Sequence, residues 1–193
     1  FELVTVSLDG KETTDYKLDG QSLLINGLNL PNTNSIAVNI HYKLALPAAT
    51  QGDPNVVRPT IFGVSDKQVN ITDWYPMVVP YSKEGWLLHQ PAFYGENLVY
   101  PVSDIKIDLT FADENNLPMI ASSALQSGPE GTHQFQLKNA RDFVFAMGRQ
   151  MHVTSGESNG ITVNSFYFDP YDKAGDAVLQ TTLQSIDLYT HLF

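Results

Sequence analysis

The sequence contains no cysteine among its 193 residues. Disulfide frameworks, thiol nucleophiles and zinc–thiolate sites are therefore excluded together, while the redox compartment stays undetermined. Long apolar runs are also missing, because none approaches the roughly 18 residues that a membrane-spanning helix needs. The first ten residues, FELVTVSLDG, do not have the pattern of a signal peptide. We expect no membrane contact from this segment; its localisation is unknown, with an extracytoplasmic compartment slightly favoured.

Basic residues are scarce as well. Only 11 lysines and arginines stand against 21 aspartates and glutamates, which gives a formal net charge of -10. A surface of this charge repels a phosphate backbone, so we expect no nucleic-acid partner. The basic residues are scattered and form no run that an anionic membrane surface would attract.

The clearest pattern that is present is strict alternation of apolar and polar residues. In residues 35–46, SIAVNIHYKLAL, the large apolar side chains fall on one face, and the small or polar ones, including His41, fall on the other. Residues 104–111 and 133–139 repeat the pattern. A period of two is typical of strands that are buried on one face. We therefore expect His41 to be an exposed histidine on the polar face of a strand.

Turn residues separate these strands. Asp-Gly or Asn-Gly pairs occur at residues 9–10, 19–20, 26–27 and 159–160, and such pairs favour the tight turns of hairpins. Almost no helical pattern occurs before residue 168. The sequence thus predicts an all-β fold, a large antiparallel β-sandwich or saddle of sheets.

The last segment follows a different period, with apolar residues returning every three or four positions from about Gly175 to the end. We expect one C-terminal helix there. The predicted division is an N-terminal β-domain over residues 1–173, with residues 174–193 as the first helix of a catalytic domain that this sequence lacks. The proline-containing residues 45–64 are expected to form a long loop.

Motifs for catalysis or metal binding are not found. No two histidines have the spacing of a helical zinc site, and neither a nucleophile elbow nor a phosphate-binding glycine loop is present. Asp169, Asp172 and Asp176 could bind calcium, but we favour acidic residues that cap the following helix. We predict no catalytic residue, metal ligand or cofactor within this sequence.

Aromatic residues are concentrated in one irregular stretch, DWYPMVVPYSKEGW at residues 73–86. They could form an exposed platform that stacks on sugars, or they could be buried bulk. We favour burial, because few polar residues are interleaved. The aromatic residues concerned are Trp74, Tyr75, Tyr81, Trp86, Phe93, Tyr94 and Tyr100.

The stretch at residues 70–111 resembles the N-terminal domain of bacterial zinc aminopeptidases of the aminopeptidase N (gluzincin) family. Residues 139–153 are similar to a further strand of that domain, and residues 177–193 to the helix that opens the catalytic domain. The residues that carry the first resemblance are Trp74, Tyr75, Pro76, Tyr81, Gly85, Trp86, Tyr94, Gly95, Glu96, Tyr100, Ser103, Asp104 and Ile105.

This resemblance implies a non-catalytic β-domain that packs against its own catalytic domain and helps to wall the cavity for a peptide substrate. The resemblance also implies that a set of residues belongs to the family motif or packs between the two domains. These residues are Trp74, Tyr75, Pro76, Tyr81, Trp86, Tyr94 and Glu96. Zinc, its ligands and the catalytic glutamate would all lie beyond Phe193. Gln68 lies near the position where the family extends a side chain towards substrate; otherwise it is an exposed loop residue. The alternative function is a carbohydrate- or protein-binding module.

Overall fold

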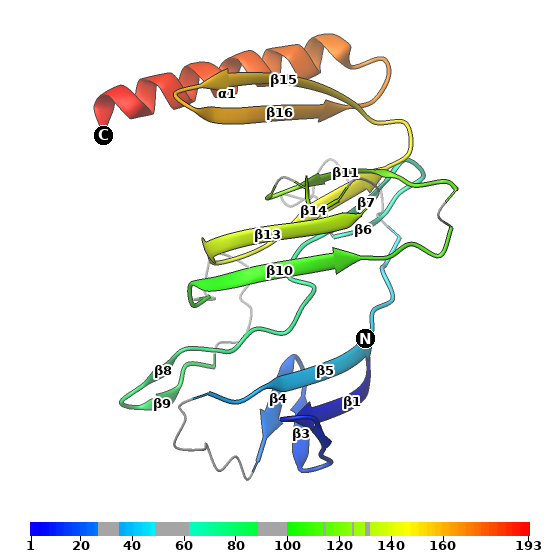
Figure 1. Cartoon of the computed structure of the whole chain (residues 1–193), viewed down its shortest axis with the longest axis vertical. Helices are drawn as coiled ribbons and strands as arrows, with labels where there is room; N and C mark the ends of the chain where they lie inside the picture. The colour runs from blue at the N-terminus through cyan, green and yellow to red at the C-terminus, as the bar shows by residue number, and fades with distance from the viewer. Residues whose placement is uncertain (27–34, 49–61, 89–99, 114, 125, 130–131) are drawn as a thin grey trace, which may run out of the picture. The chain divides into compact units, whose positions relative to one another are not determined.

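The computed structural model describes residues 1–26, 35–48, 62–88, 100–113, 115–124, 126–129 and 132–193 (Figure 1). These residues form several antiparallel sheets and one C-terminal helix, which confirms the predicted all-β class. Most of the expected loop at 45–64, together with Tyr94 and Glu96, lies outside the described residues. The boundary predicted between residues 173 and 174 stays a prediction.

The chain divides into two compact units. Unit 1 comprises Phe1–Pro47, Asp73–Asp104 and Lys138–Asp142, and unit 2 comprises Ala48–Thr72, Ile105–Leu137 and Phe143–Phe193. Each unit is thus assembled from three separate segments of the chain.

Unit 1 contains a three-stranded sheet and two separate hairpins. The sheet has the order β2-β1-β5, from β1 (Glu2–Leu8), β2 (Lys11–Glu12) and β5 (Val38–Lys43). One hairpin joins β3 (Tyr16–Asp19) to β4 (Ser22–Ile25), and the other joins β8 (Tyr81–Ser82) to β9 (Gly85–Trp86). The predicted turn after β1 has positive φ at Asp9 and Gly10, and the Asp9 carboxylate accepts a hydrogen bond from the Ala37 N–H at 2.9 Å.

Unit 2 contains a four-stranded sheet of order β11-β14-β7-β6. Its strands are β6 (Gly63–Val64), β7 (Gln68–Ile71), β11 (Met119–Ser122) and β14 (Phe145–Gly148). Unit 2 also holds most of a three-stranded sheet of order β10-β13-β12, formed by β10 (Ser103–Leu109), β12 (Gln126–Ser127) and β13 (His133–Ala140). Both sheets place alternate side chains on opposite faces.

A cluster of phenylalanines forms the core of unit 2. Phe143 is completely buried, and its ring centroid lies 5.9 Å from that of Phe135 and 6.0 Å from that of Phe145. Ile71, which pairs with Phe145 across the sheet, and Ile107 are buried as well. Burial of these apolar side chains favours folding of the unit.

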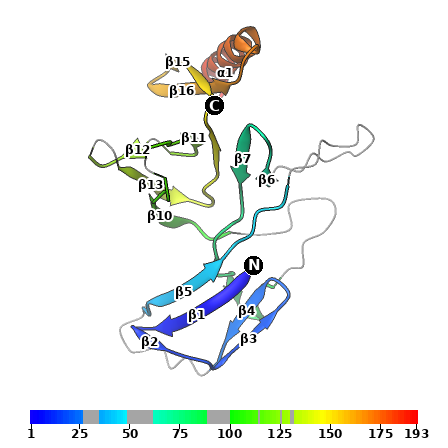
Figure 2. The same ribbon diagram turned by 90° about the vertical axis from the view of Figure 1, so that its right-hand side faces the viewer.

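A hairpin and a helix complete unit 2. β15 (His152–Ser158) and β16 (Ile161–Tyr167) are joined by the predicted turn at Asn159 and Gly160, both with positive φ. α1 (Asp172–Leu192) lies along this hairpin in both views (Figures 1 and 2). The expected C-terminal helix is therefore present. No helix among the described residues is long and apolar enough to span a bilayer.

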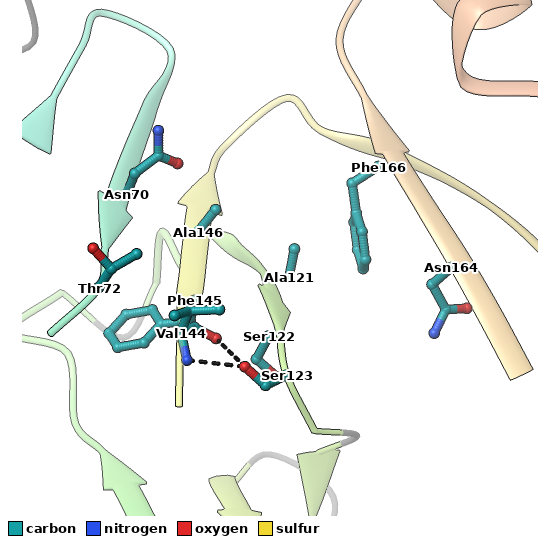
Figure 3. A pocket seen from close by; sticks show the side chains of 10 residues that line it. All are labelled: Asn70, Thr72, Ala121, Ser122, Ser123, Val144, Phe145, Ala146, Asn164 and Phe166. Atoms are coloured by element: carbon teal, nitrogen blue, oxygen red, sulfur yellow. Dashed lines mark hydrogen bonds between the residues drawn. The ribbon is translucent and has the colours of Figure 1, made fainter. Parts of the chain in front are cut away.

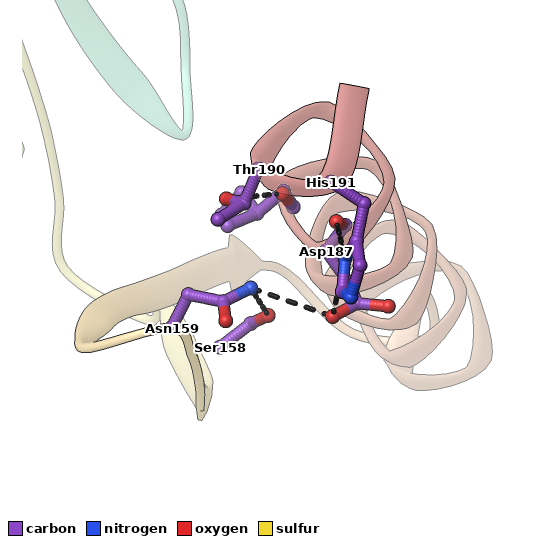
Figure 4. Close-up of polar contacts among 6 residues, drawn as sticks. Ser158, Asn159, Asp187, Thr190 and His191 are labelled. Carbon is purple, nitrogen blue, oxygen red and sulfur yellow. Dashed lines mark hydrogen bonds and ion pairs between the residues drawn. The ribbon is translucent and has the colours of Figure 1, made fainter. Parts of the chain in front are cut away.

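Polar contacts connect the C-terminal part of α1 to the turn between β15 and β16 (Figure 4). The Asn159 side-chain amide donates to the Asp187 carboxylate at 3.4 Å. His191 lies one helical turn after Asp187, with its Nδ1 3.7 Å from the same carboxylate. The last turns of the helix are thus hydrogen-bonded to the turn of the hairpin.

The start of α1 differs from the expectation. Tyr171 occupies the N-cap position and makes no side-chain capping bond, so the predicted acidic cap is wrong. Asp172 still lies in the first turn, where a carboxylate interacts favourably with the helix dipole. Asp169 instead lies 3.3 Å from Nε2 of His152.

Helix and hairpin approach each other closely at Gly175. Its carbonyl accepts a hydrogen bond from Ser165 at 2.8 Å, and a Cβ at this position would lie 2.5 Å from the Tyr167 ring. We predict that Gly175→Ala lowers the free energy of unfolding by about 1–2 kcal/mol, because the steric cost outweighs the better helix propensity. Urea unfolding measures this change.

The control is the same substitution in a Tyr167→Ala background, where the ring is gone. There Gly175→Ala is expected to stabilise the protein, since only helix propensity remains. Equal effects in both backgrounds would contradict the proposed contact.

Candidate functional site

Trp74 and Tyr75 are anchored within unit 1. Both are half-buried, and their ring centroids lie 5.4 Å apart at an interplanar angle of 79°. The Tyr42 hydroxyl, on β5, donates a 2.7 Å hydrogen bond to the Trp74 carbonyl. The next residue, Pro76, is exposed. The start of the aromatic stretch is therefore held to the first sheet by its backbone.

Two carboxylates and two phenols hold the same segment. The Tyr100 hydroxyl donates to Asp73 at 3.1 Å, and the Tyr75 hydroxyl donates to Asp142 at 3.4 Å. Arg141 donates from Nη1 to the Tyr100 carbonyl at 2.7 Å. Asp73 has a φ of 49°, so its backbone is in the left-handed region.

The acidic neighbours change the acidity of Tyr100. Burial raises its pKa most, and the negative charge and hydrogen bond of Asp73 add to that effect, with Asp142 and Tyr75 contributing less. Together they raise the pKa of Tyr100 to about 12. Burial also raises the pKa of Tyr42. Both hydroxyls therefore stay protonated to a higher pH than an ordinary tyrosine hydroxyl.

The hairpin β8–β9 carries an exposed aromatic pair. Tyr81 is 70% exposed and Trp86 is 55% exposed. The two residues pair across the strands, with ring centroids 4.8 Å apart at 68°. Val78 and Leu88, on either side, are exposed as well. The expected burial of the aromatic residues is therefore wrong for Tyr81 and Trp86 within the described part of the chain.

Gln68 belongs to unit 2 and begins β7. Its side chain is half-buried and donates from Nε2 to Oδ1 of Asn70 at 2.7 Å. Its backbone carbonyl accepts from the Ser65 N–H at 2.8 Å. The alternative interpretation as an exposed loop glutamine is therefore wrong, whereas a role next to substrate stays a prediction.

Metal-binding groups are not assembled in the described residues. Across those ranges, no three histidine, aspartate or glutamate side chains come together to hold an ion. His41 is exposed, as the strand pattern predicts. The described residues of the aromatic stretch thus form an anchored segment followed by an exposed hairpin.

Sequence reasoning missed the residues that anchor this segment. Tyr42 lies 32 residues from Trp74, and Asp142 lies 67 residues from Tyr75. Neither has a local motif, because the signal exists only once the segments come together in the fold. Among sequence features, only the pairing of aromatic and acidic residues around Asp73 could have indicated a phenol–carboxylate contact.

Comparison with known proteins gives no further assignment. No family model matches the sequence, no curated protein is detectably similar to it, and no solved structure matches its fold.

The Tyr100 phenol gives a pH-dependent prediction. Because its folded pKa of about 12 lies above the ordinary value of 10.0, its contribution to stability is complete below pH 10 and is lost as the pH rises towards 12. The pH titration of Tyr100→Phe is subtracted from that of the wild type. In this difference, we expect the phenolate absorbance of Tyr100 to appear near pH 12.

Asp73→Asn tests the cause, since it removes the negative charge but keeps the size of the side chain. The pKa of Tyr100 should then move down towards its ordinary value. An unchanged titration in Asp73→Asn would contradict the role of this carboxylate.

Proposed function

We propose that this chain is the non-catalytic β-domain of a zinc aminopeptidase and that it packs against the catalytic domain and helps to wall the peptide cavity. The observation that supports this proposal is the exposed pair Tyr81 and Trp86, which lies within the stretch that carries the family resemblance. The preceding residues Trp74 and Tyr75 are anchored to the domain itself. An anchored base with an exposed apolar hairpin is suited to packing against another domain.

The aromatic hairpin has the chemistry of an interdomain contact. Tryptophan and tyrosine each bury a large area and dominate the energetics of many interfaces. The turn between the strands contributes Lys83 and Glu84, whose charges cancel. In the proposed enzyme, zinc and its ligands belong to the catalytic part of the chain, as the family resemblance implies.

A second candidate function is a carbohydrate-binding module that uses the same aromatic pair. Exposure of both rings favours it. However, the 68° angle between the rings means that they do not form one flat platform for a sugar chain. The geometry therefore favours packing against a folded domain.

The proposal is tested on the polypeptide encoded by the complete gene. We expect bound zinc and release of amino-terminal residues from peptides, with activity lost on chelation and restored by zinc. Trp86→Ala should destabilise the assembled protein by about 2 kcal/mol, the scale of an interface hot spot. Leu18→Ala, which truncates an exposed apolar residue on hairpin β3–β4, is the matched control and should change little.

Absence of both zinc and peptidase activity from that polypeptide would overturn the enzyme proposal. Equal effects of the two substitutions would contradict the packing role of Trp86.

The alternative function, a carbohydrate-binding module, can be tested separately by tryptophan fluorescence of the 193-residue chain. The chain has two tryptophans, so Trp74→Phe leaves Trp86 as the fluorescent reporter. We expect red-shifted emission that is strongly quenched by acrylamide, because the indole is exposed. Oligosaccharides should leave this emission unchanged; a saturable change would support the carbohydrate module instead.

A further inference from the structure

Unit 2 contains a cavity of about 510 Å³ above the four-stranded sheet (Figure 3). Its floor is the face of the sheet that carries Asn70 and Ala146, and the adjoining Phe145 is also among the lining residues. Asn70, Ala146 and Ala121 form one cross-strand row of that floor. Two alanines in this row leave room above the sheet for a ligand.

The opposite wall is one face of the hairpin. Asn164 and Phe166, two residues apart on β16, line the cavity. Ser165, between them, points the other way and bonds to Gly175 of α1. The same wall continues into a smaller cavity of about 250 Å³, which Asn164 and Phe166 also line.

The two walls are joined at the base of the hairpin. A Cβ at Gly148, on β14, would lie 2.8 Å from the Phe168 ring, which directly follows β16. The nearby Met151 is buried. The Phe168 ring therefore packs against the end of β14 beside the cavity.

The lining has no charge. No lysine, arginine, aspartate, glutamate or histidine is among the residues that line either cavity. A charged ligand would lose its hydration without gaining a counter-charge, which is costly. The cavities are therefore suited to an uncharged ligand.

Polar groups remain available on both walls. Oδ1 of Asn164 accepts from Ser155 at 2.7 Å, and Oδ1 of Asn70 accepts from Gln68 at 2.7 Å. Each amide therefore keeps its NH₂ group as a donor. The Thr72 hydroxyl, on the floor, makes no hydrogen bond to another described residue. In contrast, the Ser123 hydroxyl is already bonded to the Val144 backbone, both as donor and as acceptor.

From this arrangement we propose that the cavity binds an uncharged sugar ring. The Phe166 ring offers an apolar surface for the C–H face of a pyranose, and the amides of Asn70 and Asn164 donate to its hydroxyl oxygens. The volume lies within the range of small-molecule sites, roughly 300–1,000 Å³. This site involves none of the aromatic residues of unit 1 and does not depend on the peptidase proposal.

An extended peptide fits this cavity less well. A bound strand gains its affinity from main-chain hydrogen bonds to an open sheet edge. The floor here is a sheet face whose middle strand, β14, already pairs with β7 on one side and β11 on the other, so β14 offers no open edge. A sugar needs side-chain donors and an apolar ring, which are the groups that this cavity offers.

The test is an NMR titration of the ¹⁵N-labelled 193-residue chain with glucose, galactose, mannose and N-acetylglucosamine. At least one sugar is expected to shift the side-chain amides of Asn70 and Asn164 and the backbone amides of Ala121 and Ala146, with saturation. Glucose 6-phosphate and glucosamine should bind about tenfold more weakly than their uncharged parents, because each brings an unpaired charge.

Variants locate the site. Asn164→Ala should weaken binding about tenfold through loss of one hydrogen bond, and Ala146→Leu should abolish it by filling the floor. Asn39→Ala, which removes an exposed amide from β5 in unit 1, is the matched control and should leave affinity unchanged. Thr72→Val keeps the shape of its side chain and replaces Ala146→Leu if that variant does not fold; it should also weaken binding.

Three results would overturn the proposal. One is the absence of saturable shifts at these residues with any of the four sugars. Another is binding that persists unchanged in Asn164→Ala and in Ala146→Leu, or in Thr72→Val if it replaces the latter. The third is a shift of the same signals by an uncharged tetrapeptide and by no sugar.

Discussion

Burial of Phe145 beside Phe143 determines much of the arrangement in unit 2. Because side chains on a strand alternate, a buried Phe145 requires that Val144 and Ala146 lie on the opposite face. Ile71, which pairs with Phe145, is buried as well, so its neighbour Asn70 also lies on the opposite face. A shift of one residue in this register would place the polar face against the core. The hydrophobic cluster thus defines the floor of the cavity as firmly as it defines the core.

Local signals were sufficient to predict much of the fold. The turns at Asp9-Gly10 and Asn159-Gly160 are encoded by adjacent residues, and the amphipathic period of α1 extends over several turns. The acidic cap was predicted wrongly, because Asp169 lies next to His152 instead. That contact joins residues 17 apart, which a capping rule does not consider.

The candidate sites depend on contacts that no local pattern contains. Tyr81 and Trp86 stand in irregular sequence between prolines and glycine, where periodicity gives no information about exposure, and composition alone favoured burial. The proposed sugar cavity takes its lining from β7, β11, β14 and β16, whose residues are brought together only by the fold. Sequence analysis could identify the aromatic stretch, but not which of its members are anchored and which are exposed.

The link between Asn159 and Asp187 has a consequence for the order of folding. Hairpin β15–β16 and helix α1 occupy one continuous segment, so closing their contacts costs little loop entropy. Pairing of β7 with β14 must instead enclose more than seventy residues, since Ile71 meets Phe145. The C-terminal segment can therefore form as an early cooperative unit, onto which the four-stranded sheet is completed later.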